Sequence, residues 1–170
     1  MSRPPAQASP EPALTDFLAT HKLAAPGEAA RWTPLTGGVS SDLWRVDLPG
    51  RSLCVKRALA KLKVAADWQA PVSRNAYEWA WMRFASRHRP DSVPELLAHD
   101  PEAGIFAMAF LPPEHYPMWK ARLLDGEVRV ETAAAVGELL GTLHAASAGD
   151  TALAAEFATC LLYTSDAADE

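Results

Sequence analysis

The stretch from residue 43 to residue 58 restricts the fold of this chain most, because it reads as two strands joined by a tight turn. Apolar residues alternate with polar ones at Trp44, Val46 and Leu48, which is the pattern of a strand with one buried face. A Pro-Gly pair follows, and Leu53 and Val55 then continue the buried face on a returning strand. The sequence therefore predicts an antiparallel hairpin.

The returning strand carries a lysine on its outer face. Side chains alternate along a strand, so Cys54 and Lys56 point away from the face of Leu53 and Val55. Before the hairpin comes "LTGGVSS", two adjacent glycines followed by hydroxyl residues. Glycine lets the backbone approach a ligand closely, and backbone N–H groups in such a loop can bind phosphate. A plain turn is the alternative, and the Gly-Lys-Ser/Thr ending of a Walker loop is absent.

Apolar spacing predicts three helices and a second hairpin in the remaining sequence. The strongest helical stripe comprises Tyr77, Ala80, Trp81 and Phe84, which are spaced i, i+3, i+4 and i+7. We expect helices over residues 14–23, 73–88 and 130–148, and strands over residues 32–35, 93–99 and 105–111. This order predicts an α+β fold in which a small antiparallel sheet packs against one helix.

Composition excludes several classes of protein. The formal net charge of −5 argues against binding to nucleic acid or to an anionic membrane. No apolar run approaches the roughly 18 residues that a membrane span needs, and the N-terminus has no signal peptide. The two cysteines form neither a disulfide framework nor a metal motif. We therefore expect a cytoplasmic protein, with a disordered Pro-, Ala- and Ser-rich segment over residues 1–12.

The last eleven residues, "CLLYTSDAADE", do not continue the pattern of the chain. Residues 160–170 back-translate, with permitted codons, into the adapter used in transposase-based sequencing libraries. We expect this tail to be non-native, so that the natural sequence is read only as far as Thr159. A real, acidic terminus is the alternative.

Lys56 needs an acidic partner if it is to be held against phosphates. Glu78, on the helix that follows, is the candidate. The alternatives are a solvated lysine and an i, i+4 pair between Arg74 and Glu78 on the helix surface. The glycine loop, the strand lysine and the helix glutamate occur in the order that protein-kinase-like enzymes use.

Five segments in this order resemble the aminoglycoside phosphotransferase superfamily, in the branch similar to methylthioribose kinases. They are "LTGGVSS", "LCVKRA", "NAYEWAWMRF", "LLAHDPEAGIFAMAFLPPEHYPMWK" and "VGELLGTLHAASAGD", and the resemblance covers residues 35–159. It implies a protein-kinase-like N-terminal lobe over residues 13–111. The beginning of a helical C-terminal lobe would follow over residues 112–159, so the fold would be incomplete.

The resemblance also implies an ATP site. Lys56 would contact the α- and β-phosphates and pair with Glu78, while Val46 and Val55 would sandwich the base. Backbone groups near Ala109 and Leu111 would hydrogen-bond adenine. The loop over the phosphates would be Gly37, Gly38, Val39, Ser40 and Ser41, and the hinge between lobes would be Met108, Ala109, Phe110 and Leu111.

In such enzymes, a His-Gly-Asp…Asn segment supplies the catalytic base, and a later aspartate holds Mg²⁺. Neither segment occurs in this chain, so we assign no catalytic or metal-binding residue and expect both beyond Thr159. His144 is followed by two alanines and His99 lies in a hairpin turn, so neither is the catalytic histidine. The sequence gives no indication of oligomeric state.

The function implied for the parent protein is ATP-dependent phosphorylation of a hydroxyl on a small molecule. The acceptor would be a sugar-like metabolite or an aminoglycoside. This chain itself would be inactive, since it lacks the base. The alternatives are a non-catalytic nucleotide-binding or regulatory module, and a ligand-free structural α+β domain.

Overall fold

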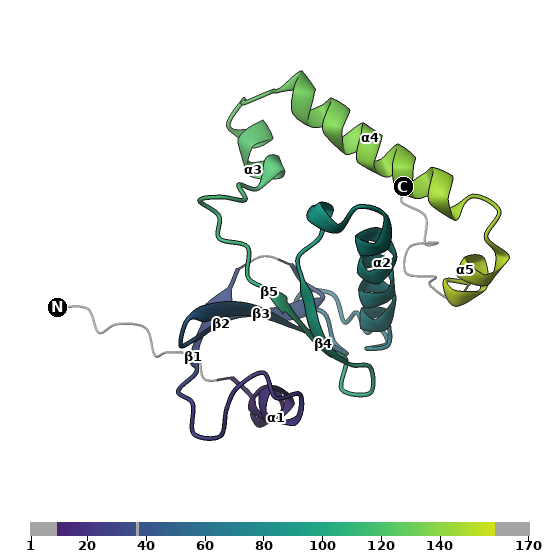
Figure 1. Ribbon diagram of the computed structural model, residues 1–170. Coiled ribbons are helices and arrows are strands. Elements are labelled where there is room, and N and C mark those ends of the chain that lie inside the picture. The colour runs from purple at the N-terminus through teal and green to yellow at the C-terminus, as the bar shows by residue number, and fades with distance from the viewer. Residues whose placement is uncertain (1–9, 37, 159–170) are drawn as a thin grey trace. The chain divides into compact units, whose positions relative to one another are not determined.

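The computed structural model describes residues 10–36 and 38–158 and shows an α+β fold (Figure 1). Gly37, most of the predicted disordered segment and the predicted non-native tail therefore lie outside the described residues. The chain divides into two compact units, with boundaries after Trp79, Val93 and Phe110. Each unit is described separately below.

The first unit is built on one antiparallel sheet of five strands, in the order β1-β2-β3-β5-β4. The predicted hairpin is present, with Trp44 opposite Val55 and Leu43 opposite Lys56. β5 pairs with β3 on its other side, so that Phe106 lies opposite Lys56. The strands are β1 (Arg31–Leu35), β2 (Ser41–Leu48), β3 (Arg51–Ala58), β4 (Leu96–Asp100) and β5 (Ile105–Ala109).

One face of this sheet packs against α1 (Pro12–Thr20) and forms the hydrophobic core (Figure 1). The helix contributes Leu14, Phe17 and Leu18, all nearly inaccessible to solvent. The strands contribute alternate residues, as the period of two predicts: Trp44, Val46, Leu48, Leu53, Val55, Ile105 and Ala107.

The opposite face of the sheet meets the first turns of α2 (Arg74–His88). Trp79 stacks on His99 of β4, with ring centroids 5.0 Å apart, and lies 5.8 Å from the ring of Phe106. β3 is consequently buried on both faces: Cys54 is buried, as are its neighbours Leu53 and Val55. Lys56 lies on this second face.

The second unit is helical. It holds the later part of α2, a short 3-10 turn (Pro90–Ser92), α3 (Trp119–Leu124), α4 (Val130–Ser147) and α5 (Thr151–Glu156). Asp150 caps α5 by accepting the N–H of Leu153 at 2.9 Å. Among the described residues of this unit, only Met82, Ala85 and Leu143 are buried.

The apolar stripe predicted on α2 is only partly covered by the protein, because Tyr77, Ala80 and Phe84 are half-buried. Trp81, a member of that stripe, is 47% exposed, whereas Asn75, Met82 and Ala85 are buried. The helix itself is confirmed, since α2 spans the residues over which the apolar side chains recur with a helical period. Which side is covered depends on the docking of Trp79, and the helical period alone does not contain that information.

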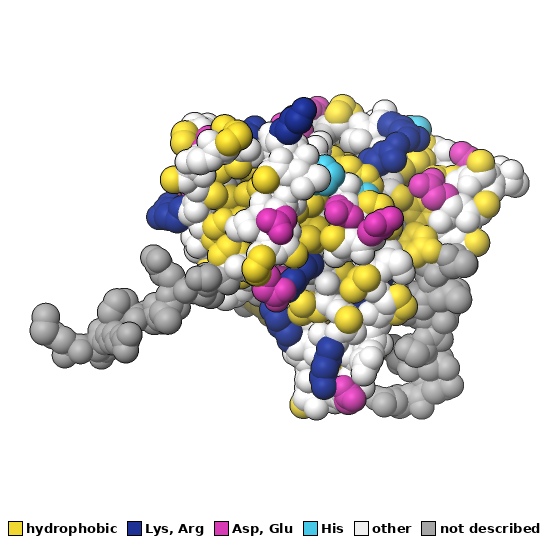
Figure 2. Space-filling view, turned by 90° about the horizontal axis from the view of Figure 1, so that it is seen from below, with side chains coloured by type: hydrophobic (Ala, Val, Ile, Leu, Met, Phe, Trp, Pro, Cys, Tyr) yellow, Lys and Arg dark blue, Asp and Glu magenta, His cyan; other side chains and the backbone are white. Residues whose placement is uncertain are grey.

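No described helix is long and apolar enough to cross a membrane. On the face drawn in Figure 2, the basic and acidic side chains of the described residues are interspersed among hydrophobic ones.

Candidate functional site

The feature with the clearest chemistry is an ion pair between the strand lysine and the helix glutamate. Nζ of Lys56 lies 2.6 Å from both Oε1 and Oε2 of Glu78. The side chain of Lys56 is 19% exposed and that of Glu78 is 42% exposed. The pairing that the family resemblance implied is therefore present, at the edge of solvent rather than in the core.

The docking of α2 explains why these two groups meet. Trp79 anchors the helix on Phe106 and His99, and Glu78 precedes it by one residue. Phe106 lies directly opposite Lys56 in the ladder, and Nζ of Lys56 is 6.0 Å from its ring centroid. The aromatic contacts thus fix the position of the carboxylate relative to the ammonium group.

The glycine loop connects β1 to β2 and is held by its carbonyl oxygens. The carbonyl of Val39 accepts the N–H of Lys63 at 2.7 Å, and that of Ser40 accepts the N–H of Leu59 at 3.0 Å. Gly38 has φ +92°, a conformation that side-chain-bearing residues rarely adopt. A Cβ added to Gly38 would meet no atom within 4 Å, so the glycine is needed for its backbone conformation rather than for space.

The predicted phosphate-contacting residues of this loop differ in their access to solvent. Gly38 and Val39 are exposed and Ser40 is half-buried. Ser41 is buried, because it begins β2 and pairs with Ala58. The exposed part of the loop is therefore the segment before Ser41.

Val46 and Val55 do not lie where the resemblance implied. Both are fully buried in the core against α1, on the face of the sheet opposite Lys56, so they cannot sandwich a base beside that lysine. The reason is the alternation of side chains along a strand. On the face of Lys56, the same two strands present Leu43 and Cys54 instead.

Cys54 is a buried free thiol close to the ion pair. Burial raises the pKa of this thiol to about 11, the charge of Lys56 acts to lower the pKa, and that of Glu78 acts to raise it. The group is protonated at neutral pH, so it is a small apolar wall of the site rather than a nucleophile.

The predicted hinge begins with the last two residues of β5, Met108 and Ala109, and continues into Phe110 and Leu111. The N–H of Ala109 donates to the carbonyl of Glu95 at 2.8 Å, and that of Phe110 donates to the carbonyl of Ser52 at 3.2 Å. The guanidinium of Arg45 lies 4.6 Å from the ring centroid of Phe110. Met108, Ala109 and Phe110 thus belong to the first unit, and the unit boundary falls before Leu111. The N–H of Ala109 is committed to the sheet.

The described residues contain no group of three or more His, Cys, Asp or Glu side chains that could hold a metal ion. His99 packs against Trp79 in the sheet, and His144 is exposed on α4. His99 thus lies within β4, opposite Phe106, rather than in the hairpin turn that the sequence predicted.

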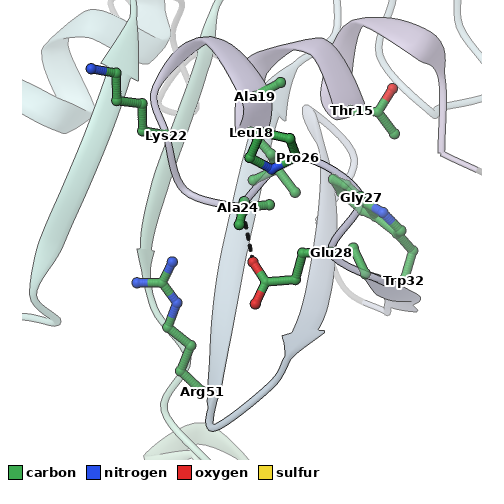
Figure 3. Close-up of a pocket in the computed structure, with 12 residues that line it drawn as sticks. Thr15, Leu18, Ala19, Lys22, Ala24, Pro26, Gly27, Glu28, Trp32 and Arg51 are labelled. Carbon is green, nitrogen blue, oxygen red and sulfur yellow. Dashed lines mark hydrogen bonds between the residues drawn. The ribbon is translucent and has the colours of Figure 1, made fainter.

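A pocket lies on the α1 side of the first unit, away from the Lys56 face (Figure 3). It is lined by α1, by the connection to β1 and by Trp32 and Arg51. Glu28 accepts the N–H of Ala25 at 2.8 Å there, and Arg51 donates to the carbonyl of Leu23 at 2.5 Å. None of the predicted ATP-site residues lines this pocket.

The sequence profile described as the phosphotransferase enzyme family (APH) matches residues 31–168. No curated protein shows a significant match. The match spans β1, the glycine loop, the Lys56 strand and α2.

Proposed function

Because the chain belongs to the phosphotransferase enzyme family, we propose that its Lys56 face binds the phosphates of ATP for transfer to a hydroxyl group. The acceptor is a small molecule, either a sugar-like metabolite or an aminoglycoside, and the reaction takes place in the cytoplasm. The observation that carries the proposal is the Lys56–Glu78 ion pair at 2.6 Å. Lys56 lies on β3, the second strand after the glycine loop.

The residues present fit the phosphate half of the nucleotide. Lys56 supplies a positive charge that Glu78 fixes in place, and its partial exposure leaves it within reach of an anion. The exposed backbone at Gly38 and Val39 adds N–H donors of the kind that bind phosphate oxygens. When bound, ATP and Mg²⁺ supply the phosphoryl group and neutralise its charge. Leu43 shares the face of Lys56 and is half-buried, so it would meet the remainder of the nucleotide.

The catalytic base and the metal ligands are not assigned to this chain. Its sequence contains no His-Gly-Asp segment, and phosphoryl transfer depends on positioned carboxylates and metal ions. We therefore propose that the 170-residue chain binds ATP without transferring its phosphate, and that the parent protein supplies the base and the acceptor pocket.

The test is replacement of Lys56 by methionine. A hydrogen bond to a charged group contributes about 1.5–3 kcal/mol, so K56M should weaken ATP binding by about 10- to 100-fold. The stability of the free protein should change by less than about 1 kcal/mol, since the Lys56–Glu78 pair is partly solvated. Isothermal titration with ATP and thermal unfolding with and without ATP measure the two effects.

Lys61 provides the matched control. It also pairs with a carboxylate, Asp67, at 2.7 Å, but both side chains are largely exposed, and we assign it no role in binding. K61M should leave ATP affinity unchanged. Equal affinity of K56M and the natural chain for ATP would contradict the proposal and leave a structural domain as the better interpretation.

A further inference from the structure

We propose that Arg74 is a positioning residue that ties the glycine loop to the same helical turn that holds Lys56. The inference rests on the proposed function, since it concerns how the phosphate-binding parts are held together. All of the contacts that carry it lie in the first unit.

The guanidinium of Arg74 is surrounded by backbone carbonyls. Nη2 donates to the carbonyl of Ser40 in the loop, and to that of Leu59 at 2.7 Å. Nη1 donates to the carbonyls of Ala70 at 3.1 Å and Pro71 at 2.8 Å. No ion pair of Arg74 occurs among the described residues. Its half-buried charge is therefore stabilised by carbonyl dipoles from three separate stretches of chain.

Arg74 and Glu78 stand one helical turn apart on α2. Residues at i and i+4 lie on the same side of a helix, so this turn contacts the loop through Arg74 and the lysine through Glu78. The surface i, i+4 pair between Arg74 and Glu78 is consequently not formed: each side chain is bonded elsewhere. The turn sets the loop and the lysine relative to each other.

The contact with Ser40 also orients the loop backbone. In a planar trans peptide, the carbonyl and the next N–H point in opposite directions. Arg74 and the N–H of Leu59 together hold the Ser40 carbonyl, so the following N–H, that of Ser41, points the other way. Without Arg74, the Leu59 bond remains, and the loop should loosen rather than detach.

Only arginine suits this position. Its planar fork presents five donors in fixed directions, whereas lysine is a compact charge with three donors. Lysine could satisfy one or two of the four carbonyls. R74K should therefore retain part of the ATP affinity and of the loop protection that R74Q loses. A role limited to overall stability would not require this intermediate behaviour.

The experiment compares R74Q, R74K and R83Q with the natural chain. Arg83 is exposed on the same helix and serves as the control. Two quantities are measured: the affinities for ATP and for adenosine, and hydrogen–deuterium exchange of a peptide spanning residues 38–42 in the free protein. Exchange of β3 in the same samples verifies that each variant is folded.

We expect R74Q to weaken ATP binding about 5- to 20-fold with adenosine affinity changed less than 2-fold, and to speed loop exchange about 10-fold. R74K should fall between R74Q and the natural chain, and R83Q should match the natural chain. Unchanged loop exchange in folded R74Q, or an equal loss of ATP and adenosine binding, would overturn the inference. If the natural chain binds no ATP, the proposed function fails, while the loop exchange still decides on Arg74.

Discussion

At the scale of single residues, Asn75 is the most unusual side chain of the described structure. It is 2% exposed, and neither its amide nitrogen nor its amide oxygen has a hydrogen-bond partner. Most buried polar side chains in proteins are paired, and an unsatisfied buried group costs about 1–3 kcal/mol. Asn75 follows Arg74 in the helical turn that holds the loop and the lysine, so the free-energy cost of this unsatisfied amide falls next to the proposed site.

Replacing Asn75 by leucine should stabilise the protein. Leucine has the same branched side-chain skeleton as asparagine with bulkier methyl groups, no polar atoms and a better helix propensity. We expect the free energy of unfolding to rise by about 1–3 kcal/mol, measured by urea denaturation. N75A, which leaves a cavity, should gain less. A destabilised N75L with a normal fold would show that the amide has a polar partner in solution, such as an ordered water.

At the scale of elements, β2 carries an aspartate network near each of its ends. Asp42 accepts from Lys63 at 2.6 Å and from Arg57 at 3.0 Å. Asp47 accepts from Ser52, Arg45 and Arg31 at 2.6, 2.7 and 2.8 Å. The Asp42 network is connected to the glycine loop through Lys63, whose backbone N–H donates to the carbonyl of Val39. The Asp47 network has no such link among the described contacts.

Both carboxylates should make stability depend on pH. Burial acts to raise the pKa of Asp42, but hydrogen bonds from Lys63 and Arg57 outweigh it and lower the pKa. The hydrogen bond from Ser52 is the main cause of the lowered pKa of Asp47. The unfolded chain therefore binds more protons than the folded one where these two groups titrate. Their contribution to stability is present above the unfolded pKa of about 4 and is lost as the pH falls through the lower pKa of the folded protein.

The substitutions D42N and D47N distinguish the effect of pH on stability from the effect of Asp42 on ATP binding. Each should flatten the loss of stability below about pH 4, which is followed by urea unfolding at a series of pH values. D42N alone should also weaken ATP binding, since it releases Lys63 beside the loop. Equal ATP affinity in the two variants would contradict a link between Asp42 and the loop.

The elements that local pattern determines could be read from the sequence. The hairpin of β2 and β3, with Lys56 on its outer face, needed only the alternation of apolar residues. The same alternation places Val55 on the face opposite Lys56. The position beside the base that the family resemblance implied for Val55 conflicts with this alternation. The short helices α3 and α5 have six residues each, too few to show a helical period. Arg74 could not be found, because backbone carbonyls leave no sequence signal.

At the scale of the whole molecule, the two units differ in how much they bury. The first unit contains the continuous core between α1 and the sheet, and β3 is buried on both faces. In the second unit, α4 has 18 residues, of which only Leu143 is buried. Val130 and Leu140 are among its exposed apolar side chains. Since packing rather than propensity stabilises most helices, α4 should be held weakly.

We therefore expect the units to open at different free energies. Backbone amides of β3 should exchange only on global unfolding, while those of α4 should exchange through local opening, about 100-fold faster or more. Hydrogen–deuterium exchange of the full chain, read on peptides covering β3 and α4, measures the difference. Equal protection would contradict it and would mean that the units unfold together. Unequal protection would mean that the Lys56 site, which lies wholly in the first unit, keeps its geometry while α4 opens, so ATP should then protect the loop without slowing exchange in α4.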